Sequence, residues 1–140
     1  MESSERFAKL KQEVEDAERN VRASSSQTEA ELRAKVDEAR KSADQRAAKL
    51  RDASQNASTD AHAHWREVQG NWDQHVHRLR ERVGQRKAER DVNRAERHAE
   101  WAEADAGDAI DFAAAAIEEA EYAILDAELA RLDADALVAS

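Results

Sequence analysis

The chain lacks cysteine and proline altogether, and it has very little glycine and few aromatic residues. Without cysteine it has no disulfide, no thiolate nucleophile and no cysteine-based zinc site. Glycine occurs only at Gly70, Gly84 and Gly107, and aromatic residues make up 4% of the 140 residues. Because β-sheets need turn residues together with aromatic and β-branched side chains, these absences argue against a β-rich fold.

Long apolar runs are missing as well. No stretch of about 18 consecutive apolar residues occurs, so we expect no membrane-spanning helix. The first residues, MESSER, are not followed by the apolar core that a secretory signal requires. These two features predict a cytoplasmic protein.

Charged residues are abundant, at 38% of the chain, and the apolar fraction of 41% is largely alanine. This composition is typical of long helices and coiled coils. An alanine methyl buries little apolar surface, so it contributes less to stability than a leucine. We therefore expect residues 1–59 to need the rest of the chain, a second copy or a partner to fold. The large apolar residues of this segment are Phe7, Leu10, Val14, Val21, Leu32, Val36 and Leu50.

Apolar residues recur at intervals of three and four, which places them on one face of a helix. The pattern predicts an all-α protein: long alanine-rich amphipathic helices in an antiparallel, coiled-coil-like bundle of three helices, or four. Residues 1–140 would form a single helical domain. The stripes are Phe7, Leu10, Val14, Ala17 and Val21; Leu32, Val36, Ala39, Ala43, Ala47 and Leu50; Ala61, Trp65, Val68, Trp72, Val76, Leu79 and Val83; and Val92, Ala95, Ala99, Ala102, Ala106, Ile110, Ala113, Ile117, Ala120, Ile124 and Ala127.

Helix boundaries follow from capping signals. The predicted helices span residues 4–53, 58–83 and 88–137. The first of these helices is either continuous or broken near residues 24–28, where two short sequences match a capping box. The two matches are Ser26 with Glu29 and Thr28 with Glu31.

The three glycines are assigned different roles. Gly84 follows Arg80 and Arg82, and cations followed by glycine are typical of a helix C-terminus. The alternative is that Gly84 kinks one long helix. Gly70 and Gly107 fall where the apolar stripe continues in phase, so we expect them to allow close approach of a neighbouring backbone.

Charge is unevenly distributed along the chain. Residues 99–140 hold twelve acids against one base, Arg131, a charge of −11, so the remaining residues carry +2 of the total of −9. Residues 78–97 are locally basic. The favoured interpretation is a solvated surface, and the alternative is that the acidic segment docks on a basic segment of another copy or of a partner protein. Nucleic acid is disfavoured as a partner, because the net charge repels phosphates.

The last predicted helix is the most apolar one. Besides its main stripe it has a second apolar face with Phe112, Leu125, Leu129 and Leu132. We therefore expect this helix to be the most buried of the chain.

The five histidines raise the question of a metal site. His64 and His75 share a helix face, but eleven residues separate them by about 16 Å. One ion with bonds near 2 Å cannot bridge that distance. These two residues stay weak candidates, and we expect no metal and no cofactor. A metal-binding helical bundle, with histidines from two helices, is an outside alternative.

No phosphate-binding glycine loop and no serine-elbow motif occurs, so we expect no enzymatic activity. The sequence predicts a self-associating helical interaction protein that acts as a scaffold, adaptor or oligomerisation module. The alternative is an amphipathic lipid-surface or stress-associated protein, partly disordered until bound. A membrane surface is disfavoured, because the most apolar helix is also the most acidic. The candidate interface anchors are Trp65, Val68, Trp72, Trp101, Phe112 and Tyr122.

Overall fold

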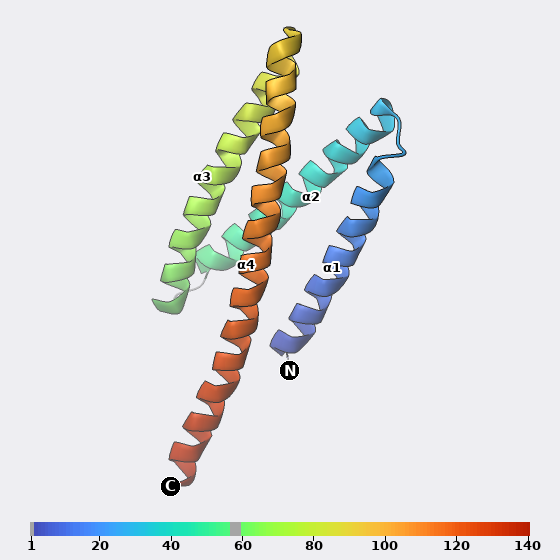
Figure 1. The fold of residues 1–140 in the computed structure, drawn as a ribbon. Coiled ribbons are helices and arrows are strands. Elements are labelled where there is room, and N and C mark those ends of the chain that lie inside the picture. The colour runs from blue at the N-terminus through green and yellow to red at the C-terminus, as the bar shows by residue number, and fades with distance from the viewer. Residues whose placement is uncertain (1, 57–59) are drawn as a thin grey trace. The chain divides into compact units, whose positions relative to one another are not determined.

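The protein is helical through nearly all of the part that the structure describes (Figure 1). The computed structural model describes the backbone of residues 2–56 and 60–140 and the side chains of residues 3–53, 63 and 65–140. Four helices occur in these residues: α1, Glu2–Ser24; α2, Glu29–Asn56; α3, Asp60–Ala88; and α4, Val92–Ala139. The prediction of an all-α fold is confirmed. No helix in these ranges combines the length and the apolar character needed to cross a bilayer.

The chain divides into two compact units. The first consists of Met1–Val14 and Ala88–Ser140, and the second of Glu15–Lys87. The start of α1 thus groups with α4, while the rest of α1 groups with α2 and α3. Within the second unit, Nη2 of Arg80 on α3 lies 3.2 Å from Oδ1 of Asp44 on α2. This ion pair joins two helices of the same unit.

A break separates α1 from α2, so one continuous helix over residues 4–53 does not form. Thr28 caps α2: its Oγ1 accepts a hydrogen bond from the Glu31 N–H (3.2 Å) and donates to Oε1 of Glu31 (3.0 Å). The Thr28 half of the predicted capping box is therefore present, while the Glu31 carboxylate accepts from the Thr28 hydroxyl. The hydroxyl of Ser26 instead donates to the carbonyl oxygen of Ala23 (3.0 Å). The cap gives a partner to an N–H that no helical carbonyl can reach, which explains why α2 begins directly after Thr28.

The predicted end of a helix at Gly84 is wrong, since α3 continues through it to Ala88. No glycine of the described residues has a positive φ, so Gly84 does not adopt the left-handed C-cap conformation. A single glycine costs a helix about 1 kcal/mol, and the residues after it are good helix formers. The close backbone approach expected at Gly70 and Gly107 is also absent, because a Cβ at either position would meet nothing within 4 Å. The start predicted at residue 58 lies outside the described residues.

A short turn of three residues joins α3 to α4. Oε1 of Glu89 accepts hydrogen bonds from the N–H groups of Asp91 (2.9 Å) and Arg90 (3.0 Å). Asp91 is the N-cap of α4, and its Oδ1 accepts from the Arg94 N–H (3.0 Å). The hydrogen bond from Asp91 is the main cause that lowers the pKa of Glu89, and partial desolvation opposes it. The Arg90 N–H and the nearby charges of Arg94 and His98 lower this pKa further.

Little apolar surface is buried. Among the described side chains, none of the hydrophobic ones is buried, and the one buried polar residue is Gln69, at 7% exposure. The expectation that the C-terminal helix is the most buried is wrong, since no residue of α4 is buried. An apolar face shows that a helix can pack, but packing also requires a second element of the chain to cover that face.

The capping box gives the first testable prediction. Thr28→Ala removes the hydroxyl that binds the Glu31 N–H, so we expect a loss of about 1 kcal/mol in the free energy of unfolding. Thermal unfolding followed by circular dichroism measures this loss. Ser26→Ala is the matched control and should cost less, because the Ser26 hydroxyl caps no helix start. Equal losses for the two variants would contradict the capping role.

The α3–α4 turn gives a prediction about pH. Because the pKa of Glu89 is lowered below its ordinary value of 4.5 in the folded chain, its stabilising effect is fully present above that value. The effect is lost as the pH falls through the lowered, folded-state pKa. Glu89→Ala should therefore speed amide hydrogen exchange at Arg90 and Asp91 near neutral pH, and the difference from wild type should shrink in acid. Glu96→Ala is the control, and a difference independent of pH would exclude the charge of Glu89 as the cause.

Candidate functional site

The described histidines, His75, His77 and His98, do not gather into a metal site. Among the described residues, no three or more His, Cys, Asp or Glu side chains gather where one ion could bind them all. The ring of His75 lies 5.5 Å from the ring of Trp72, tilted by 36°. The side chain of His64 lies outside the described residues. His77 contacts Glu81 along α3, with 3.1 Å between Nε2 and Oε1.

One face of α3 is its most covered surface, and we call it the α3 seam. It consists of Gln69, Trp72, Val76, Leu79 and Val83, spaced three and four residues apart; Gln69 is buried and the other four are half-buried. Trp72 is thus the most covered of the predicted anchors on α3. The amide nitrogen Nε2 of Gln69 is buried without a hydrogen-bond partner. The α3 seam therefore has a polar group at its most enclosed position.

Sequence reasoning missed Gln69. It placed Val68 on the stripe, but Val68 is exposed at the border and Gln69 occupies the position three residues before Trp72. The spacing alone could have indicated this residue. An apolar pattern passes over glutamine, because glutamine is mostly found on protein surfaces.

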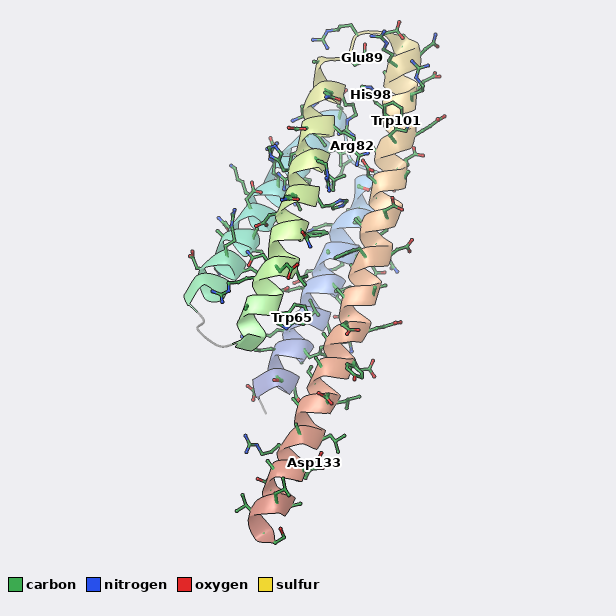
Figure 2. All side chains as sticks on the ribbon, turned by 90° about the vertical axis from the view of Figure 1, so that its left-hand side faces the viewer. Trp65, Arg82, Glu89, His98, Trp101 and Asp133 are labelled. Carbon is green, nitrogen blue, oxygen red and sulfur yellow. The ribbon has the colours of Figure 1, made fainter. Side chains whose placement is uncertain are left out.

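The other predicted anchors are exposed. Trp65 on α3 is 53% exposed, and Figure 2 shows it near the start of that helix. Trp101 stacks on His98 near the N-terminal end of α4, with ring centroids 5.3 Å apart (Figure 2). Phe112 and Tyr122, further along α4, are exposed too. Trp65, Val68 and Trp72 belong to one compact unit, and Trp101, Phe112 and Tyr122 belong to the other.

The last part of α4 is exposed on every side. The half-buried positions of this helix end at Ile124, and every residue from Leu125 to Ser140 is exposed. Three leucines of this part and Tyr122 just before it form one stripe, which we call the C-terminal leucine stripe: Tyr122, Leu125, Leu129 and Leu132, each between 56% and 66% exposed. The stripe lies roughly 120° around the helix from the half-buried face.

Acidic residues border the C-terminal leucine stripe on both sides. The spacing of the stripe continues to Ala136. Each acid from residue 121 to residue 135 is the sequence neighbour of a stripe residue or of Ala136. The acids are Glu121, Asp126, Glu128, Asp133 and Asp135. Figure 2 shows Asp133 close to the C-terminal end of α4. The one base of this stretch, Arg131, lies on a different side of the helix, about 140° from the centre of the stripe.

The buried amide of Gln69 gives a prediction about stability. Gln69→Leu replaces an unpaired buried polar group with an apolar one, so the free energy of unfolding should rise by about 1–3 kcal/mol. Chemical denaturation measures the change. Gln74→Leu, an exposed position on the same helix, is the control and should have little effect. A lower stability of Gln69→Leu would show that the amide makes a contact that the chain depends on.

Comparison of the chain with protein-family models, with curated proteins and with solved structures finds no match. The exposed helix faces and the charges beside them are therefore the features on which a proposal of function rests.

Proposed function

We propose that the protein is a non-enzymatic helical interaction protein, which acts as a scaffold, adaptor or oligomerisation module. The observation that carries this proposal is the exposure of large apolar side chains on each of the four helices. Val21 on α1, Val36 on α2, Trp65 on α3 and Leu129 on α4 are all about half exposed or more. Contiguous exposed apolar surface on a soluble protein marks a site of interaction.

Helix energetics support the same proposal. Most of the stability of a helix in a protein comes from packing its apolar face, because propensity alone leaves isolated helices marginal. The 48 residues of α4 include no buried side chain. Packing against another chain would add apolar burial worth about 25 cal/mol for each Å² removed from water.

The surface around Trp65 and Val68 is the one that we assign to self-association. Tryptophan is enriched among the residues that dominate binding energy in protein interfaces. The next residues in the chain, Arg66 and Glu67, carry opposite charges. A second copy can therefore approach this part of α3 without a local excess of one charge.

A lipid surface is the competing kind of partner, and charge disfavours it. The acids beside the C-terminal leucine stripe repel anionic headgroups, whereas helices that lie on membranes usually have lysine and arginine on their polar face. Circular dichroism with and without anionic vesicles separates the two classes. A helical interaction protein should gain no helix when vesicles are added.

The proposal predicts a molar mass above that of one chain. Size-exclusion chromatography with light scattering, at two concentrations, should give a mass above 15.7 kDa that rises with concentration. The double variant Trp65→Ala, Val68→Ala should shift the mass toward a single chain, because it removes the apolar contacts of the interface. Val92→Ala, an exposed apolar position on α4, is the control and should keep the wild-type mass.

Two results would contradict self-association at this surface. One is a wild-type mass of 15.7 kDa at both concentrations. The other is a double variant with unchanged helicity and unchanged mass.

A further inference from the structure

We infer that the C-terminal leucine stripe binds a basic amphipathic helix of a partner protein, with lysine or arginine on both sides of an apolar stripe. This inference rests on the proposed function and names the chemistry of one partner. It concerns α4 alone and is independent of the surface around Trp65.

The geometry of the stripe is that of one side of a coiled coil. Tyr122, Leu125, Leu129 and Leu132 are spaced three, four and three residues apart, and Ala136 follows after four more. In heptad terms they alternate between the a and d positions that pack against a facing helix. Their exposure in this structure leaves that packing surface uncovered.

The acids occupy the positions that meet the flanks of a facing helix. With Tyr122 and Leu129 at a, Asp126 and Asp133 fall at e, while Glu128 and Asp135 fall at g. Glu121 is the g residue before them. Charges at e and g choose the partner of a coiled coil by attraction and repulsion across the interface. A helix with basic residues at these positions would neutralise five acids while its apolar stripe covers the leucines.

A second copy of the same stripe is a poor occupant in either direction. Parallel helices place g of one chain against e of the other, and antiparallel helices place g against g and e against e. Every such pair here would be acid against acid, and like charges at these positions are destabilising. The repulsion selects a partner of the opposite charge.

The basic segment of a second copy is also a poor occupant. Of its large apolar residues, Leu79 and Val83 are already half-buried in the α3 seam, and the exposed Val92 lies beyond the turn on α4, so it does not share their helix face. Arg80, between them, lies against Asp44 of the same unit. This segment therefore has no free apolar stripe to place on α4. Anionic lipid is repelled by the same acids that border the stripe.

The test uses the full chain and a synthetic peptide of about four heptads, long enough to form a helix, with leucine at a and d and lysine at e and g. Isothermal titration calorimetry should show saturable binding that weakens as salt is added, because the flanking ion pairs are screened. The triple variant Leu125→Ala, Leu129→Ala, Leu132→Ala should lose about tenfold or more in affinity. All three positions are exposed, so circular dichroism should show unchanged helicity.

A pair of charge variants separates the stripe from general attraction to an acidic protein. Asp126→Lys with Asp133→Lys should lose about tenfold or more in affinity. Glu96→Lys with Glu103→Lys makes the same change of charge at exposed positions of α4, about 33 Å or more from Leu125, and should stay within about threefold of wild type.

The inference is overturned by equal losses in the two charge variants, by a leucine variant that binds as well as wild type, or by no binding at all. It is also overturned if the triple leucine variant lowers the molar mass of the protein alone, because a second copy would then occupy the stripe. Loss of binding to anionic vesicles in that variant would assign the stripe to lipid. The peptide-binding results do not bear on the surface around Trp65, and a protein that is monomeric yet binds the peptide would overturn self-association alone.

Discussion

The structure depends on one constraint: a helix satisfies its own backbone but cannot cover its own apolar face. Within α4, 48 residues form their hydrogen bonds along a single helix, and none of their side chains is buried. The chain has many alanines and few large apolar residues. Its helices therefore have long apolar faces, but each residue on these faces can bury only a small apolar area when the face packs. The exposed surfaces on the four helices are the direct result, and the proposed function follows from them.

In the proposed function, polar residues restrict which partners these faces can accept. Gln69 places an unpaired amide at the most enclosed position of the α3 seam, and a polar group at such a position restricts the possible registers of packing. The acids beside the C-terminal leucine stripe restrict the charge of any facing helix. Apolar contacts supply affinity for many helices, whereas these polar and charged positions discriminate among them.

Local signals in the sequence were good guides where the chemistry involved neighbouring residues. Thr28 caps α2 through the Glu31 N–H, as their spacing predicts, because both partners lie within one helical turn. Gly84 wrongly predicted the end of a helix. One glycine costs a helix little free energy, and the residues that follow Gly84 are good helix formers. Gly70 has no close neighbour, although its place on an apolar stripe suggested one. The burial expected for α4 was wrong as well. A close neighbour and a buried face both require a second element that packs against the helix, and the apolar stripe alone does not show that one is there.

The sequence by itself determined the helical class of the fold, the capping signal of Thr28 and Glu31 and the acidic border of the last apolar stripe. These follow from composition, spacing and contacts between near neighbours, which the chain order already specifies. Only the tertiary structure decided which stripe residues are covered: Gln69 is buried rather than Val68, Trp72 is half-buried while Trp65 is not, and Leu125 to Ser140 are exposed throughout. Coverage depends on which helices share a compact unit, and helix periodicity is the same for a covered face and an open one.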